Sequence, residues 1–369
     1  MLTQQQVVPY LLDRGLIRAE HVVDGDLAVI DASRRNCNFQ VTSQEGPSYL
    51  IKQGVGPEGL VAVAHEAAVY RYFQSNPGKP VLNSCLPAYH GYDENEGVLI
   101  LQLLSNAETL SECHARRRHF SVSLAAQLGV VLAKLHSPAH AQRKEGGQNR
   151  PASPPAWILF IHRPHLSALR DISAANLELT RIIQSSSGLC RNLDELRLSW
   201  TRATLIHQDL RGQNILVFAK STGRRRMAVK LVDWECACYA DPCWDVGSMF
   251  SDYLCSWLFS IPDCGDDAPE RSIEFARYPL EKIQPAILAF WKSYSRAMHL
   301  DLATSQRRLL LAVRYAAARM LQTAFENLQR ATRVTRDILH LVQVSSNILD
   351  RPCEASIHLL GIPLTVPAE

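Results

Sequence analysis

Four polar residues between positions 207 and 233 have the types and the spacing that phosphoryl transfer requires. His207, Asp209 and Asn214 form an H-x-D-x-x-x-x-N pattern within LIHQDLRGQNILV. Asp233 follows Asn214 by nineteen residues, at the end of a second apolar run. Phosphoryl transfer needs a carboxylate that orients and deprotonates an attacking hydroxyl, and hard oxygen ligands for a metal ion that bridges the phosphates. The pattern predicts a loop with this chemistry.

A lysine and a glutamate upstream suit the other half of such a reaction, which is the binding of a nucleotide. Lys52 lies in the strand-like run YLIKQ, and Glu66 lies in the helix-like run HEAAVYRYF that follows. A helix carboxylate can hold a lysine so that its ammonium group reaches the α- and β-phosphates. Either residue alone would mean little. The order Lys, Glu, Asp–Asn, Asp on these elements is much harder to obtain by chance.

The elements that must position these residues change in kind along the chain. Short apolar or β-branched runs bounded by turn residues predict strands, and apolar residues at helical spacing predict helices. The first strands are expected at 27–31, 36–42, 49–53 and 98–103, with a helix at 59–75. Further helices are expected at 124–136, 307–329 and 335–349, the last two closing the chain, with a second pair of strands at 215–218 and 228–232.

This order of elements predicts an α+β protein of two lobes joined near Leu104. The N-lobe, residues 1–104, is a small antiparallel sheet with one key helix and binds the nucleotide. The larger C-lobe, residues 105–369, is mainly helical and carries the catalytic loop, the metal site and the acceptor-binding helices. Residues 139–155 and the basic run 220–226 predict an exposed loop and a solvated turn.

The chain resembles the aminoglycoside phosphotransferase and choline kinase superfamily, whose core is shared with eukaryotic-type protein kinases. The resemblance runs from about Asn36 to Asp245 and rests on LGVVLAKLH, LIHQDLRGQNILV and LVDWECACYADPCWDVG. It implies a bilobal protein-kinase-like fold and transfer of the γ-phosphate of ATP, or GTP, to a hydroxyl of a small molecule with the help of Mg²⁺. Asp245 is implied to brace the catalytic loop from a helix.

The resemblance also gives a role to each matching site residue. Asp209 is implied to be the catalytic base, and Asn214 and Asp233 are implied to hold Mg²⁺. Lys52 is implied to contact the α- and β-phosphates, with Glu66 as its anchor.

Three departures from the family pattern bear on the site. Gln208 stands where the family usually has Gly, so the local backbone is expected to differ. Arg211 stands where protein kinases usually have Lys and many small-molecule kinases have His, and we assign it to the γ-phosphate. The loop 33–38 has no glycine, so backbone amides there must contact phosphate without glycine's freedom, aided by Arg35 or Asn38.

Residues 54–59 fit G-x-G-x-x-G between a strand and a helix, as a dinucleotide-binding fold would have it. That fold requires a second strand ending in Asp or Glu about 20 residues further on. The chain instead has Asn76-Pro77-Gly78-Lys79-Pro80 in this region. A loop between strand and helix is the favoured interpretation.

Cys236, Cys238 and Cys243 lie close enough in the sequence to suggest zinc. Their C-x-C-x₄-C spacing is not that of a usual zinc site, and no fourth ligand is evident. Small hydrophobic side chains beside Asp233 are the favoured interpretation, with zinc or redox chemistry as the alternative.

Composition restricts the partners and the location of the chain. The 369 residues are 47% hydrophobic and 20% charged, with a net charge of +3. This balance argues against nucleic acid and a membrane surface as partners. The first sixteen residues lack the basic start and apolar core of a secretory signal, so the ten cysteines are expected as thiols in a cytoplasmic protein.

The acceptor is the least determined part of the prediction. Acidic residues between 263 and 274 could attract a cationic acceptor, although a solvated loop is favoured. Trp244, Tyr253 and Trp257 could line a pocket, although aromatic residues at this spacing are more often core.

Two functions besides small-molecule phosphotransfer stay open. One is a nucleotide-binding pseudokinase that acts as a regulatory or scaffold module, and the other is a kinase that acts on a peptide. Asp-Trp-Glu at 233–235 and the lack of a downstream Ala-Pro-Glu segment argue against a protein kinase.

Overall fold

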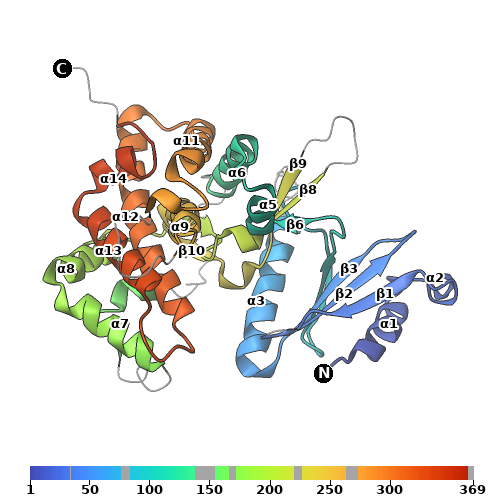
Figure 1. Cartoon of the computed structure of the whole chain (residues 1–369). Coiled ribbons are helices and arrows are strands. Elements are labelled where there is room, and N and C mark those ends of the chain that lie inside the picture. Colours follow the sequence, from blue (N-terminus) through green and yellow to red (C-terminus); the bar gives the residue numbers. More distant parts are fainter. Residues whose placement is uncertain are drawn as a thin grey trace, which may run out of the picture. The chain divides into compact units, whose positions relative to one another are not determined.

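The computed structural model describes residues 1–33, 35–75, 84–137, 154–165, 172–219, 227–262 and 273–364 (Figure 1). The predicted basic turn at 220–226, the acidic residues 263–270 and nearly all of the predicted loop at 139–155 lie outside the described residues. The chain forms two compact units. Unit 1 comprises Met1–Leu110 and Gln213–Ala237, and unit 2 comprises Ser111–Gly212 and Cys238–Glu369.

Unit 1 is built on a five-stranded sheet in which every neighbouring pair is antiparallel. The spatial order is β1 (Leu27–Asp31), β2 (Cys37–Ser43), β3 (Tyr49–Gln53), β5 (Val98–Gln102) and β4 (Tyr89–Asp93). The four predicted strands are present. β4 was not predicted, because its sequence YHGYD has no apolar alternation and its pairing shifts register near Gly91.

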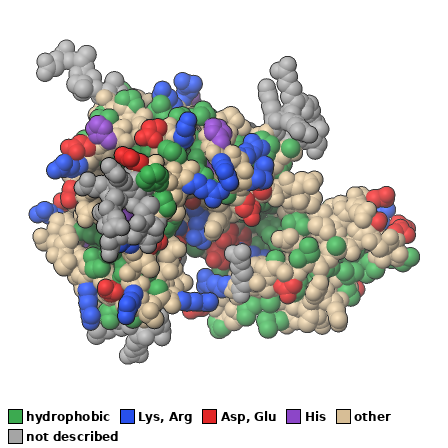
Figure 2. Space-filling model, in the orientation of Figure 1, with side chains coloured by type: hydrophobic (Ala, Val, Ile, Leu, Met, Phe, Trp, Pro, Cys, Tyr) green, Lys and Arg blue, Asp and Glu red, His purple; other side chains and the backbone are tan. Residues whose placement is uncertain are grey.

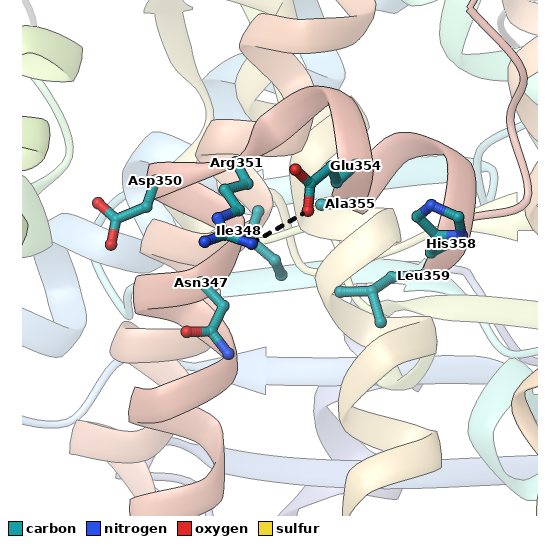
Figure 3. Close-up of a pocket in the computed structure, with 8 residues that line it drawn as sticks. All are labelled: Asn347, Ile348, Asp350, Arg351, Glu354, Ala355, His358 and Leu359. Atoms are coloured by element: carbon teal, nitrogen blue, oxygen red, sulfur yellow. Dashed lines mark hydrogen bonds and ion pairs between the residues drawn. The ribbon is translucent and has the colours of Figure 1, made fainter.

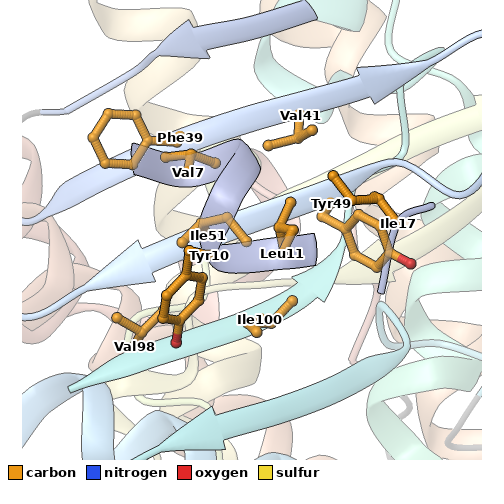
Figure 4. Close-up of a cluster of buried hydrophobic side chains, with 10 residues drawn as sticks. All are labelled: Val7, Tyr10, Leu11, Ile17, Phe39, Val41, Tyr49, Ile51, Val98 and Ile100. Atoms are coloured by element: carbon orange, nitrogen blue, oxygen red, sulfur yellow. The ribbon is translucent and has the colours of Figure 1, made fainter. Parts of the chain in front are cut away.

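Helices cover the two faces of this sheet. Successive strand residues point to opposite faces, so Ile51 and Lys52 on the central strand β3 face different neighbours. Ile51 faces α1 (Gln4–Asp13) within a cluster of buried apolar side chains (Figure 4). Lys52 points the other way and meets Glu66 on α3 (Gly56–Gln74). A short helix, α2 (Ala19–Val23), follows α1.

The helix α1 was not predicted, although its sequence contains the signal. Val7, Tyr10 and Leu11 are buried and lie at i, i+3 and i+4 on one face. Gln6 caps the helix start, because its Oε1 accepts the Thr3 N–H at 2.9 Å. This helix gives the sheet a dry face.

A second, three-stranded sheet explains why residues 213–237 belong to unit 1. β8 (Ile215–Ala219) and β9 (Met227–Leu231) form the predicted antiparallel hairpin, and β8 also pairs with β6 (Glu108–Thr109). Lys230 on β9 donates to the Leu86 carbonyl at 2.6 Å. These units describe compactness and not function, so the division into functional lobes at residue 104 stays a prediction.

Unit 2 is mainly helical in its described residues. The principal helices are α5 (Leu110–Arg117, which starts at the unit boundary), α6 (Val122–Leu135), α7 (Ala174–Ser185), α8 (Ser187–Ser199), α9 (Pro242–Leu258), α11 (Leu280–Ala297), α12 (Leu302–Asn327), α13 (Arg336–Asp350) and α14 (Pro352–His358). The expectation that two long helices close the chain was wrong, because α14 follows α13. A pair of short strands, β7 (Thr204–Ile206) and β10 (Cys238–Ala240), lies beside α9.

Two glycines let the helices of unit 2 pack closely. A Cβ on Gly129 of α6 would lie 2.4 Å from the Phe290 carbonyl of α11, and one on Gly247 of α9 would lie 2.6 Å from the Ala312 carbonyl of α12.

Three aromatic side chains on α9 are buried: Trp244, Tyr253 and Trp257, which are 1%, 1% and 7% exposed. The expectation that they belong to the core is confirmed.

The glycines of the G-x-G-x-x-G run have a packing role in the loop from β3 to α3. A Cβ on Gly54 would lie 2.5 Å from the Gly59 carbonyl, and one on Gly59 would lie 2.7 Å from Asn36 Oδ1. Gly56 begins α3 with a φ of +67°, a conformation that side chains disfavour. Because the sheet around this loop is antiparallel, a dinucleotide-binding βαβ unit is absent from the described part of unit 1.

The surface offers no membrane-spanning element in the part of the chain that is described, since none of its helices is both long and apolar enough to cross a bilayer. Acidic and basic side chains are interspersed over the face drawn in Figure 2.

A cavity of about 450 Å³ lies where α13 meets α14 (Figure 3). Arg351 and Glu354 in its wall pair with each other at 3.5 Å.

Replacing Leu11 by Ala should lower the free energy of unfolding by about 2–4 kcal/mol, because Leu11 is fully buried between α1 and the sheet. Urea unfolding followed by circular dichroism measures the change. Val23→Ala is the control, since Val23 is 83% exposed and should cost less than about 0.5 kcal/mol. Equal effects of the two substitutions would contradict the packing of α1.

Candidate active site

The residues of unit 1 that are predicted to bind a nucleotide meet at a buried lysine. Lys52 Nζ donates to Glu66 Oε2 and to Asp233 Oδ1, both at 2.6 Å. Burial lowers the pKa of Lys52, but the two carboxylates outweigh burial and raise that pKa above its ordinary value. The ammonium group is therefore charged at neutral pH. The contact expected between Lys52 and Glu66 is present, and Asp233 shares it.

Glu66 fixes two parts of this cluster at once. Its side chain is 1% exposed, and its second oxygen, Oε1, accepts the Trp234 backbone N–H at 3.2 Å. The Trp234 ring packs edge-on against Phe73, about two helical turns further along α3, with ring centroids 5.3 Å apart. The Glu66 carboxylate on α3 therefore holds both the Lys52 side chain and the backbone of Trp234, the residue after Asp233.

The two predicted metal ligands are placed by the hairpin of β8 and β9. The Asn214 carbonyl accepts the Val232 N–H at 3.0 Å, which extends the ladder by one pair and brings Asn214 beside the turn that contains Asp233. Asp233 has a left-handed backbone (φ 67°, ψ 62°), which turns the chain into a short 3₁₀ helix, Trp234–Cys236. Asn and Asp side-chain oxygens are hard ligands of the kind that magnesium binds.

Among the described residues there is no group of three or more His, Cys, Asp or Glu poised to hold a metal. Mg²⁺ in kinases takes ligands from phosphate oxygens and water as well as from protein side chains. Cys243 is buried, Cys236 is exposed, and Cys238 contacts the Gln208 side chain.

Asn38 lies opposite Lys52 in the β2–β3 pairing, so both side chains share one face of the sheet. Within the described residues, the Oδ1 atom of Asn38 is buried and has no hydrogen-bond partner. A buried polar atom without a partner is costly, and a bound ligand could satisfy it. Arg35 lies 3.7 Å from both Glu58 and Glu235 and is largely exposed.

The predicted catalytic residues of unit 2 form a network of ion pairs with α12. Asp209 Oδ1 accepts a hydrogen bond from Arg319 Nη2 at 2.8 Å, and Asp209 Oδ2 lies 3.2 Å from Arg211 Nη2. Both guanidinium groups also pair with Glu326, Arg211 at 3.4 Å and Arg319 at 3.1 Å. Gln322 donates to the same glutamate at 2.9 Å.

Arg319 and Glu326 were not predicted as site residues. Arg319 is 3% exposed in a helix whose other buried residues are apolar or Tyr315. A buried arginine requires partners, so its position in an apolar run was an available signal. Its partner Asp209 is 110 residues away in the sequence, and nothing in the local pattern indicates that pairing.

The backbone of the predicted catalytic loop is held from α9. Asp245 accepts the His207 N–H at 2.8 Å and the Gln208 N–H at 2.9 Å, one with each carboxylate oxygen. His136 contacts the same carboxylate at 3.2 Å and the Tyr294 hydroxyl at 3.0 Å. All of these groups except Gln208 are buried. The contact that the bracing role of Asp245 requires is therefore present.

Gln208 adopts a left-handed backbone, with φ of 69°. The sequence led us to expect a changed backbone here, since the related family usually has Gly. The structure instead shows the conformation that Gly favours, occupied by a residue with a Cβ. The Gln208 carbonyl accepts the Trp244 Nε1–H at 2.9 Å, so the strained turn is fastened on its carbonyl side as well as its amide side.

A model of a known protein family matches most of this chain. The model of the phosphotransferase enzyme family matches residues 26–264. The chain belongs to this family. No curated protein matches its sequence.

Among solved structures, choline kinase from Cryptosporidium parvum is 12% identical over 97% of this chain and 98% of that chain, with a TM-score of 0.58. The choline kinase LicA from Streptococcus pneumoniae is 13% identical over 92% of this chain and 99% of that chain, with a TM-score of 0.47. The first likeness confirms the predicted α+β, bilobal protein-kinase-like fold.

For this phosphotransferase-family chain, the residues predicted from the sequence form two groups. Lys52, Glu66 and Asp233 are in contact in unit 1, with Asn214 in the adjoining ladder. In unit 2, Asp209 and Arg211 are in contact through their side chains. The individual roles of these residues stay predictions.

Changing Gln208 to Gly should raise the free energy of unfolding relative to Gln208→Val by about 1–2 kcal/mol, since a β-branched residue is strained at positive φ. Thermal unfolding of the two variants and of the wild type measures the difference. Gln127 on α6 is the control position, because a helix there should favour Val over Gly. The same order of stabilities at both positions would contradict backbone strain at Gln208.

Proposed function

We propose that this chain is an ATP-dependent phosphotransferase that moves the γ-phosphate to a hydroxyl of a small molecule. Membership of the phosphotransferase enzyme family supports the class of reaction. The observation that carries the proposal is the buried Lys52 ammonium, held by Glu66 and Asp233 at 2.6 Å each. A cation fixed in this way beside a metal-binding carboxylate is the arrangement that polyphosphate binding requires.

In the proposed reaction Lys52 binds the α- and β-phosphates, and Glu66 keeps its ammonium group in position. Asn38 lies on the same sheet face and offers a buried carboxamide to the nucleotide. Asn214 and Asp233 would hold Mg²⁺, which supplies neutralisation of the charge that develops on the phosphates. GTP could replace ATP, because the phosphate-binding residues do not distinguish the bases.

Asp209 would accept the hydroxyl proton as the acceptor oxygen attacks the γ-phosphorus. Arg319 holds one oxygen of this carboxylate, which fixes its orientation for proton transfer. Arg211 lies beside the other oxygen and would turn toward the γ-phosphate when it binds, as a cation that stabilises the charge of the transferred group.

A nucleotide-binding pseudokinase is the second candidate. One observation favours it: both oxygens of Asp209 face guanidinium groups, at 2.8 and 3.2 Å. A carboxylate whose two oxygens stay engaged by guanidinium groups is less accessible to an acceptor hydroxyl. In that case the chain would bind ATP and Mg²⁺ and would transfer no phosphate.

Replacing Asp209 by Asn should lower kcat by about 10²–10⁴-fold and leave the affinity for ATP nearly unchanged, because Asn cannot accept the hydroxyl proton. Replacing Lys52 by Met should lower kcat/KM for ATP by about 10²-fold or more. A coupled assay of ADP release, with Mg²⁺ and a panel of alcohols, measures both.

The matched controls are Asp24→Asn and Lys282→Met, two exposed positions outside both groups of site residues. Both controls should keep wild-type rates. Mg²⁺-dependent ATP binding without turnover of any alcohol would favour the pseudokinase. Absence of nucleotide binding in the wild type would contradict the proposal.

A further inference from the structure

The helix α9 carries a second carboxylate that the proposed reaction has not used so far. Asp252 follows Asp245 on α9 by seven residues, so the two side chains lie on the same face of the helix, nearly two turns or about 10 Å apart. Asp245 accepts the N–H groups of His207 and Gln208 at the start of the predicted catalytic loop. A loop that runs along this face of α9 can therefore be held at two points.

The contact of Asp252 with this loop is a hydrogen bond to the backbone. Asp252 Oδ1 accepts the Gly212 N–H at 3.0 Å. A hydrogen bond from an amide to a charged carboxylate is roughly twice as strong as one between neutral groups. Because Gly212 stands three residues after Asp209, this bond holds the loop on the C-terminal side of the proposed catalytic base.

Gly212 fits closely between α9 and α5. A Cβ on Gly212 would lie 2.5 Å from Ser111 Oγ in α5, 3.2 Å from Ser111 N and 3.0 Å from Asp252 Oδ2. All three distances are shorter than the separation at which non-bonded atoms attract each other best. A larger residue at position 212 would therefore push the loop away from Asp252.

The residues between the two anchor points have separate surroundings. Leu210 is fully buried, at 0% exposed. Asp209 and Arg211, on either side of it, pair with Arg319 and Glu326 of α12, a helix that packs against α9 (Figure 1). The loop thus has its backbone held by α9, its apolar side chain in the core and its charged side chains paired with α12.

The strain in this loop requires an anchor on each side. Gln208 has a left-handed backbone that residues with a Cβ disfavour, and it directly precedes Asp209. Such a conformation persists only where the surrounding structure fixes the chain. Asp245 fixes the chain at Gln208 itself, and Asp252 fixes it four residues further on.

The charge of Asp252 and its hydrogen bond can be separated by substitution. Partial burial raises the pKa of Asp252, and the Gly212 N–H and the charges of Arg319 and Arg211 oppose this rise. Asp252 therefore also interacts electrostatically with the arginines that hold Asp209. Asn at this position keeps an acceptor oxygen for the Gly212 N–H and loses the charge, whereas Ala loses both.

We propose that Asp252 is a positioning residue for the phosphotransfer reaction and that it acts through the Gly212 amide. Together with Asp245 it fixes the predicted catalytic loop at both ends, and the loop then presents the Asp209 carboxylate to the acceptor hydroxyl in one orientation. The inference rests on the proposed function and adds a residue to the same site.

Replacing Asp252 by Ala should lower kcat by about 10–100-fold and leave KM for ATP nearly unchanged, because displacement of a reacting group by about 1 Å can cost about 10²-fold in rate. Replacing it by Asn should keep kcat within about threefold of the wild type, since the Gly212 N–H keeps its acceptor. ADP release is measured with ATP, Mg²⁺ and the alcohol of the panel that the wild type phosphorylates fastest.

The matched control is Asp301→Ala. Asp301 caps α12, and its carboxylate also accepts a backbone N–H, that of Thr304 at 2.9 Å. It precedes Arg319 by eighteen residues on this helix, or about 27 Å. Its loss should lower the melting temperature and leave kcat unchanged. If Asp252 had only a structural role, the two alanine variants would behave alike.

Hydrogen exchange tests the anchor without any acceptor. Exchange of the Gly212 amide, followed by mass spectrometry on overlapping peptides across residues 207–214 of the full chain, should be about tenfold faster in Asp252→Ala than in the wild type and unchanged in Asp252→Asn. Thermal unfolding checks that each variant is folded. Gly212→Ala is the second variant if Asp252→Ala does not fold, and it should lower kcat by about tenfold, because its Cβ separates the loop from α9.

Three results would overturn the inference: wild-type kcat in Asp252→Ala, an equal loss of kcat in Asp252→Asn and Asp252→Ala, or unchanged exchange of the Gly212 amide in Asp252→Ala. In each of these cases the wild type still phosphorylates an alcohol, so the proposed function stands. If the wild type phosphorylates no alcohol, the proposed function fails and this inference fails with it.

Discussion

A buried ammonium group shared by two carboxylates is the interaction on which the candidate site depends. Lys52 on the central strand cannot be charged and buried without partners, because removal of an isolated charge from water costs several kcal/mol. Glu66 and Asp233 supply these partners, each 2.6 Å from the ammonium nitrogen. Since Glu66 also accepts the Trp234 N–H, the charge requirement of Lys52 fixes the position of the chain around Asp233.

The sheet beneath this cluster is organised by the same requirement. The alternation of side chains along β3 sends Ile51 to one face and Lys52 to the other. The helix α1 covers the Ile51 face with Val7, Tyr10 and Leu11 and makes it dry. A shift of one residue in the pairing would exchange the two faces and bury Lys52 among apolar side chains. The apolar cluster of α1 therefore also specifies the direction in which Lys52 points.

In unit 2 the Asp245 carboxylate holds two backbone amides. In unit 1 the Glu66 carboxylate holds the Lys52 side chain and one backbone amide. Asp245 accepts two successive amide protons, and this contact maintains Gln208 in a left-handed conformation that costs about 1–2 kcal/mol. The turn presents Asp209 to Arg211 and Arg319. The strain is located next to the proposed catalytic base, as is common where a loop must present one side chain in one orientation.

Much of the fold was predictable because its signals are local. The strands at 27–31 and 49–53 were predicted with their observed bounds, since each is a short apolar run between turn residues. β4 was missed because YHGYD owes its place to the edge of the sheet beside β5 and has no apolar alternation of its own. The helix α1 was not predicted, although Val7, Tyr10 and Leu11 have helical spacing.

The sequence by itself determined the chemistry that is available, because the types and order of Lys52, Glu66, Asp209, Asn214 and Asp233 are the requirements of phosphoryl transfer. Only the tertiary structure decided which groups share a charge. Arg319 reaches Asp209 across 110 residues, and Phe325 meets Trp157 across 168. No local pattern encodes such pairs, because they form only when segments that are far apart in the chain pack together.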